Sequence, residues 1–194
     1  MATINTNAGA MIALQNLNKT NADLQQVQQR INTGLAISSA KDNGGVFAIA
    51  QSMRADVAGY KAVGQSLDLA QSTTDVALAA GEAISDLMVE MKEKALASKD
   101  TSLDTAARNA LNEDFKALRD QIGTIVQNAE FNGTNLISNG AADITALANA
   151  DGSNTITIGA EDLSLTGTTI TLTAGSQINT TTLANAAVSA IETS

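Results

Sequence analysis

The side chains that carry most acid–base and metal chemistry are scarce in this sequence of 194 residues. Histidine and cysteine are both absent, which removes the commonest general base, the commonest metal ligand and every thiolate site. The pairs Glu113-Asp114 and Glu161-Asp162 could serve acid–base catalysis or bind a metal ion. However, adjacent side chains on a helix point apart, and no polar cleft is evident, so a solvated face explains these pairs better.

A second candidate for metal chemistry is Asp151-Gly-Ser-Asn154, which is similar to the start of a calcium-binding loop. Such a loop needs a glutamate at its twelfth position, where this chain has Asp162. We therefore expect no catalytic residue, no metal site and no cofactor.

The charge is negative overall and unevenly distributed. The formal net charge is −9, all 11 lysines and arginines lie between Lys19 and Arg119, and none follows Gln121. An acidic surface repels phosphate backbones, so we expect no nucleic-acid partner. The N-terminus lacks the basic and apolar regions of a cleavable signal, and no segment approaches the roughly 20 apolar residues of a membrane span. These features predict a cytoplasmic protein, or one exported without such a signal.

Three long amphipathic helices are expected in the first two thirds of the chain, over residues 8–34, 44–98 and 103–128. Hydrophobic residues make up 44% of the chain but aromatic residues only 2%, and there is no proline. Small aliphatic side chains favour close helix–helix seams, and the second helix alone would extend roughly 80 Å. The fold class is therefore mainly α, with long antiparallel helices in a coiled-coil-like rod. The stripe on the first helix contains few charges and is predicted to pack between subunits through Leu14, Leu17, Leu24 and Ile31.

A short joint should separate the first helix from the second. Gly34 can adopt the left-handed conformation that ends a helix, and Ser38 and Ser39 can cap the free N–H groups of the next one. Lys41-Asp42 adds a charge pair. We assign the helix hinge to Arg30, Gly34, Ser38, Ser39, Lys41 and Asp42.

The last third changes in character and predicts a small β element. Asn132-Gly133 and Asp151-Gly152 are turn dipeptides, and one or two helical turns could form over 142–150. Alternation with period two predicts strands over 155–158, 163–165 and 169–173. A helical pattern resumes at 182 and the sequence stops within it, so we expect that other subunits or a longer chain supply the missing partners.

Four motifs, in order along the first 136 residues, resemble bacterial flagellin: Ile4-Asn-Thr-Asn7, the joint Arg30–Asp42, Gly45-Val-Phe-Ala-Ile-Ala-Gln-Ser-Met53 and Phe131-Asn-Gly-Thr-Asn-Leu136. The resemblance is to the N-terminal two thirds of a flagellin, and is closer to the short type of alphaproteobacteria. It implies a non-enzymatic assembly protein whose terminal helices form the inner tube of a filament and whose variable segment faces outward. It also implies homopolymer contacts with other flagellin subunits, an export apparatus with a chaperone, and an extracellular location in the flagellum without a cleavable signal peptide.

The resulting prediction is a structural subunit of the flagellar filament that polymerises through helix packing. The alternative is a self-associating coiled-coil adhesin or a component of a secretion needle. The predicted parts are an inner-tube helix and hinge (1–43), a long-helix rod with a β-hairpin (44–138), a surface-exposed β-rich segment (139–182) and the start of a further helix (183–194).

Overall fold

The computed structural model describes residues 7–194 and confirms a mainly helical chain with small antiparallel strand pairs. The N-terminal Ile4-Asn-Thr-Asn7 motif lies outside the described residues except for Asn7. In chain order the described elements are α1 (Ala8–Thr33), α2 (Gly44–Ser98), α3 (Thr105–Asn128), β1 (Glu130–Phe131), β2 (Thr134–Asn135), β3 (Ile144–Leu147), β4 (Thr155–Ile158) and α4 (Thr181–Glu192). The helices therefore begin and end within about two residues of their predicted limits.

The chain divides into two compact units, one ending at Ala58 and one beginning at Gly59. The first unit contains α1, the joint and the first turns of α2. The Asn7 side chain accepts a hydrogen bond from the Ala10 N–H at 3.1 Å and caps α1. Gly34 ends the helix with φ of +66°, as its residue type predicts. No residue of α1 is buried.

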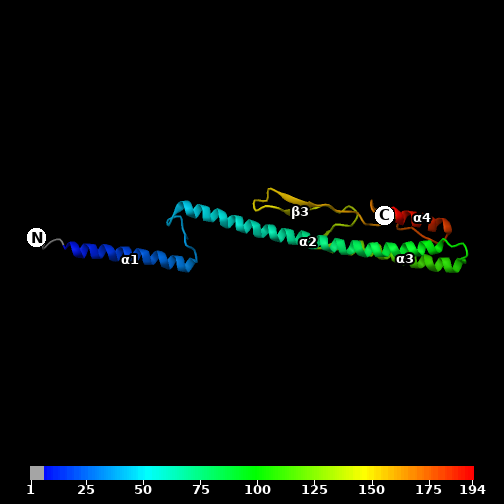
Figure 1. The fold of residues 1–194 in the computed structure, drawn as a ribbon, viewed down its shortest axis with the longest axis horizontal. Coiled ribbons are helices and arrows are strands. Elements are labelled where there is room, and N and C mark those ends of the chain that lie inside the picture. Colours follow the sequence, from blue (N-terminus) through cyan, green and yellow to red (C-terminus); the bar gives the residue numbers. More distant parts are fainter. Residues whose placement is uncertain (1–6) are drawn as a thin grey trace. The chain divides into compact units, whose positions relative to one another are not determined.

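The core lies in the second unit, where α3 runs back along the C-terminal half of α2 (Figure 1). The side chain of Asp104 caps α3 by accepting a hydrogen bond from the Ala107 N–H at 2.7 Å. Met91, Ala95, Phe115 and Ile122 are fully buried between the two helices. The seam is thus built mainly from aliphatic side chains, with one aromatic ring at its centre.

The buried face of α3 differs slightly from the predicted stripe. Phe115 and Ile122 are buried as expected, but Leu111, Leu118 and Ile125 are only half-buried at the edge of the core. The face that points inward follows the spacing of Asn112, Phe115, Arg119, Ile122 and Val126, and so includes two polar residues.

Both turn dipeptides form hairpin turns. Asn132 and Gly133 have φ of 51° and 80° and join β1 to β2, as the dipeptide predicts. In the second hairpin, Ile144 pairs with Ile158 and Leu147 with Thr155, and Gly152 takes φ of +71° in the loop. The prediction of helical turns over 142–150 is wrong, because this segment supplies β3 as the partner of β4.

The predicted strands over 163–165 and 169–173 are also absent. The alternation there reflects packing without a strand ladder: Ile170 and Leu172 are buried in the core while Thr171 is exposed. The backbone bonds irregularly, with the Thr166 N–H donating to the Leu172 oxygen at 2.8 Å. Alternate residues are therefore buried because an extended segment packs against helices, and not because it belongs to a sheet.

The β3–β4 hairpin lies along α2 and contacts it at two points. The Leu147 N–H donates to the Ser66 hydroxyl oxygen at 3.1 Å. Three residues later, Ala150 approaches Gly59 so closely that any side chain at Gly59 would collide with the Ala150 carbonyl group. The glycine thus forms a seat for the loop of the hairpin.

The last described helix, α4, closes the core of this unit. Its N-cap is Thr180, whose side chain accepts from the Leu183 N–H at 3.2 Å. Ala184, Ala187 and Val188 are buried in the same cluster as the α2 and α3 residues, and Lys92 of α2 pairs with Glu192 at 3.1 Å. The predicted domain limits at 43/44, 138/139 and 182/183 remain predictions.

Candidate assembly site

The apolar stripe of α1 is fully displayed on the surface of its unit. The four residues predicted to pack between subunits are 58%, 57%, 52% and 74% exposed: Leu14, Leu17, Leu24 and Ile31. Met11, Ile12 and Val27 of the same helix are also exposed. Burying such side chains is worth about 1.5–3 kcal/mol each, so this surface is costly to leave in water.

The first turns of α2 continue this character within the same unit. Val46, Ile49, Met53 and Val57 are 44–69% exposed and recur at helical spacing. An amphipathic helix whose apolar side is open gains most of its stability only after a partner covers that side. These two helical segments are the best candidates for an assembly surface in the first unit.

The joint between α1 and α2 is held by a carboxylate. Asp42 Oδ2 accepts hydrogen bonds from the backbone N–H and the hydroxyl of Ser38, at 3.3 and 3.4 Å. Partial desolvation raises the pKa of Asp42, but hydrogen bonds from the Ser38 and Ser39 N–H groups and the charge of Arg30 outweigh it and lower that pKa overall.

The predicted cap of α2 requires a correction. Ser38 and Ser39 do not cap the helix; the Asn43 side chain does, by accepting from the Val46 N–H at 3.2 Å. The serines lie too far before Gly44 and instead build the turn around Asp42. Lys41 takes no part in the four ion pairs found within residues 7–194.

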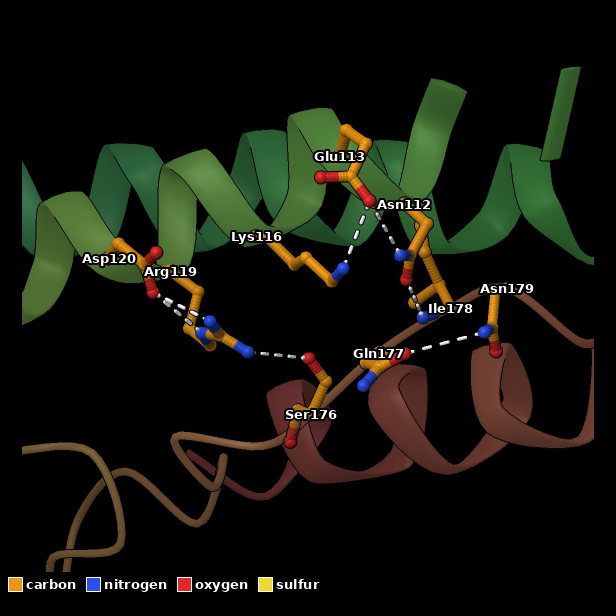
Figure 2. A network of polar contacts seen from close by, with 9 residues as sticks. All are labelled: Asn112, Glu113, Lys116, Arg119, Asp120, Ser176, Gln177, Ile178 and Asn179. Carbon is orange, nitrogen blue, oxygen red and sulfur yellow. Dashed lines mark hydrogen bonds and ion pairs between the residues drawn. The ribbon is translucent and has the colours of Figure 1, made fainter. Parts of the chain in front are cut away.

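A polar clamp, made of Ser98, Asn112 and Arg119, fixes the segment before α4. Figure 2 shows the contacts of Asn112 and Arg119 with this segment. Asn112 Oδ1 accepts from the Ile178 N–H at 2.8 Å, and the Ser98 hydroxyl donates to the Ile178 carbonyl oxygen. Both backbone groups of a fully buried residue are therefore satisfied by side chains from two different helices.

Arg119 completes the clamp, and Arg108 stabilises the end of α2 next to it. Arg119 donates to the Ser176 carbonyl oxygen at 3.0 Å and pairs with Asp120 at 2.7 Å. Arg108 donates to the Ser98 carbonyl oxygen at 3.2 Å and so supports the end of α2. The clamp binds backbone atoms and not side chains of the segment. Substitutions at 176–177 should therefore leave it intact, whereas a change in the backbone path there would break it.

Sequence reasoning missed the clamp, although a signal was present. Asn112 and Arg119 lie seven residues apart and in phase with Phe115 and Ile122, so they had to point into the seam. When the inward face of a helix is identified from its apolar residues alone, polar residues on that face are missed.

Both carboxylates of the Glu113-Asp114 pair form ion pairs with lysines of the same chain. Glu113 pairs with Lys116 at 2.9 Å, whereas Asp114 reaches Lys94 on α2 at 3.4 Å. The hydrogen bond and charge of Lys116 lower the pKa of Glu113. Hydrogen bonds from the Ser164 hydroxyl and N–H likewise lower the pKa of Asp162.

Residues 7–194 contain no group of three or more His, Cys, Asp or Glu side chains placed to hold a metal ion. Over the same residues, no helix is long and apolar enough to cross a membrane.

The family follows from comparison with known proteins. A family model described as the bacterial flagellin N-terminal helical region matches residues 4–142. The chain belongs to the bacterial flagellin family. This flagellin is 57% identical to flagellin FljN of Caulobacter vibrioides over 84% of its length, and 53% identical to flagellin FljK over 98%. It is 34% identical to flagellin C of Rhizobium meliloti over 73% of its length.

The coverage of the relatives is partial. The chain spans 60% of the length of FljN, 68% of FljK and 43% of the Rhizobium protein. The crystal structure of Bacillus cereus flagellin matches 65% of this chain and 72% of that chain, with a TM-score of 0.55 and 24% identity. That likeness supports the fold, and the flagellin resemblance seen in the sequence is confirmed.

Proposed function

We propose that this flagellin is a structural, non-enzymatic subunit of the bacterial flagellar filament. The observation that carries the proposal is membership of the family together with a full-length apolar stripe on α1 that the chain leaves exposed. The comparisons favour this role over an adhesin or a secretion-needle component, since the named relatives are flagellins.

The same proposal gives the chain its partners and its location. It would act outside the cell as part of a homopolymer, through contacts between flagellin subunits. We further propose that an export apparatus and a chaperone deliver it, and that no cleavable signal peptide is needed. Leu14, Leu17, Leu24 and Ile31 would pack between helices in the polymer, and the joint from Arg30 to Asp42 would set the direction of the chain between its layers.

The test replaces one leucine of the stripe by a carboxylate. In Leu17→Asp or Leu24→Asp the charge would be buried at every subunit contact, which costs several kcal/mol without a partner. We expect secreted subunits that form no filaments in electron micrographs, with the helical circular dichroism signal of the second unit retained.

The matched control is Gln15→Asp, which adds the same charge close by but about 160° around the helix from the stripe. We expect normal filaments from this control. Normal filaments from Leu17→Asp and Leu24→Asp as well would show that the stripe faces solvent.

A further inference from the structure

Methionine supplies all the sulfur of this chain, because the sequence contains five methionines and no cysteine. The structure describes four of them, and they fall into two pairs. Met88 and Met91 are 8% and 0% exposed in the core of the second unit. Met11 and Met53 are 66% and 62% exposed on the first unit. Because the oxidation of a thioether depends on access to its sulfur, only the second of these two pairs is open to attack in the free subunit.

Met53 occupies the centre of the exposed apolar side at the start of α2. It lies four residues after Ile49 and four before Val57, and residues four apart are neighbours on one face of a helix. Val46, seven residues before Met53, continues the same face, and all three neighbours are exposed. The Met53 sulfur therefore lies among the side chains that the proposed function would bury in a subunit contact.

Met11 has a similar exposed fraction but a different position relative to the apolar surface of its helix. It lies about 120° around α1 from the centre of the stripe formed by Leu14, Leu17, Leu24 and Ile31. Its nearest position around the helix among those tested is Gln15, the site of the control substitution, about 40° away. The two exposed methionines thus give an oxidant similar access, but only Met53 is surrounded by an apolar stripe.

We propose that Met53 is a reversible oxidation site that controls assembly, with hydrogen peroxide as the oxidant. This inference rests on the proposed function and adds to it a regulation of the same surface. A lone pair of the Met53 sulfur attacks one peroxide oxygen, and the O–O bond breaks. The sulfur loses two electrons and keeps that oxygen as a sulfoxide, while the other oxygen leaves as water. A dithiol reductant reverses the step: the two thiols become a disulfide, and the sulfoxide oxygen leaves as water.

The sulfoxide makes the centre of this apolar face polar. Its oxygen accepts hydrogen bonds, and Ile49 and Val57 beside it have no side-chain donor to offer. Burying that oxygen in a subunit contact therefore carries the penalty of an unpaired polar group, and we expect the critical concentration for polymerisation to rise about tenfold. In an assembled filament the contact covers the sulfur. Oxidation thus acts on subunits before they assemble and leaves existing filaments intact.

The test begins with filaments sheared from cells and subunits released from them by mild heating. Both are treated with hydrogen peroxide, and the oxidised methionines are located by mass spectrometry of peptides. In free subunits, Met11 and Met53 should gain an oxygen at least about tenfold faster than Met88 and Met91. In intact filaments, Met53 should react at least about tenfold more slowly than in free subunits. Treatment of the oxidised subunits with methionine sulfoxide reductase should restore their critical concentration.

Three variants assign the effect to one sulfur. Met53→Leu keeps an apolar side chain of similar volume, so it should polymerise normally and should not respond to peroxide. The matched control, Met11→Leu, removes a thioether of similar exposure and should remain as sensitive to peroxide as the wild type. Met53→Gln places an amide oxygen near the position of the sulfoxide oxygen, and should raise the critical concentration about tenfold without any oxidant.

Other outcomes overturn the oxidation site and leave the proposed function standing. They are an unchanged critical concentration after Met53 is oxidised, and equally fast oxidation of Met53 in filaments and in free subunits. Sensitivity to peroxide that persists in Met53→Leu, or that disappears in Met11→Leu, would assign the effect to another methionine. Cells that secrete this flagellin but yield no filaments would instead refute the filament role, together with the regulation that rests on it.

Discussion

Asn112 occupies a position in the helix seam where an apolar residue would be expected, and it is 3% exposed. Its side-chain oxygen accepts the Ile178 N–H, which has no partner in a strand or helix. A buried N–H left without a partner costs about 1–3 kcal/mol, more than an average hydrogen bond contributes. The hydrogen bond to the Ile178 N–H therefore explains why a polar residue occupies this buried position.

Asn112→Ala should accordingly lower the free energy of unfolding of the second unit by about 1–3 kcal/mol, measured by urea denaturation. Hydrogen exchange at the Ile178 amide should accelerate in the same variant. Asn128→Ala removes an exposed asparagine that bonds only to Thr124 on its own helix, at 2.9 Å, and serves as the control. Equal losses from the two variants would contradict the clamp.

Asp42 makes the joint sensitive to acid. Its pKa is lowered in the folded chain, so its hydrogen bonds stabilise the joint above the unfolded-state pKa and are lost as pH falls through the lowered folded value. In an NMR experiment, we expect the carboxyl carbon of Asp42 to titrate at a lower pH than that of free aspartate. Over the same acid range, the Ser38 amide hydrogen should exchange faster than the intrinsic pH dependence of exchange alone predicts. Asp42→Asn should abolish this acid-dependent component, whereas an unchanged profile would count against the carboxylate.

At the scale of elements, the helix α1 and the helices of the second unit are determined by different interactions. In α1 local signals suffice: Asn7 and Gly34 delimit the helix, and its apolar spacing survives with no residue buried. In the second unit each helix is defined by its neighbours as well, through the seam of α2 and α3 and the clamp. Stability should therefore be uneven along the chain.

We expect α1 to exchange its amide hydrogens rapidly in the free monomer, because an isolated helix of 26 residues without a covered face is only marginally stable in water. Amides of α3 should be protected by orders of magnitude more. Comparison of the monomer with assembled filaments would show protection of α1 appearing only on assembly. Equal protection of α1 and α3 in the monomer would refute this view.

The elements also show what a sequence can reveal here. The helix limits, the Asn132-Gly133 hairpin and the exposed stripe follow from caps, spacing and turn residues, which are local. The segment 163–173 was predicted incorrectly because alternating burial looks the same against helices as in a sheet. The clamp was missed because the partner of Asn112 is 66 residues away and is a backbone group, for which no residue type gives a signal.

For the whole molecule, tolerance to change should follow the anchoring points of the backbone. The loop at Asp151-Gly152 is exposed, and apart from the contact of Ala150 with Gly59 its interactions are local, as in the hydrogen bond from Asn149 to Ser153 at 2.7 Å. Residues 176–178, in contrast, are held by side chains from α2 and α3. Loops with few outside contacts accept insertions, and anchored segments do not.

An epitope tag inserted between Asp151 and Gly152 should therefore leave the thermal unfolding midpoint within a few degrees of wild type and remain accessible to antibody along filaments. The same tag inserted between Gln177 and Ile178 should unfold the second unit at a clearly lower temperature, followed by circular dichroism. Filaments in which the Asp151 tag is hidden would place the segment 139–182 between subunits rather than outside.

The close contact between Gly59 of α2 and the loop of the β3–β4 hairpin links the length of the hairpin to the position of the glycine. Between the two contacts, the chain advances three residues in the hairpin, from Leu147 to Ala150, and seven in the helix, from Ser66 to Gly59. A residue added to a strand advances the hairpin by about 3.3 Å, whereas a helix rises only about 1.5 Å per residue. A flagellin whose hairpin is one residue longer in each strand should hence carry its small residue about two positions earlier in the helix, so that insertions in one element and substitutions in the other evolve together.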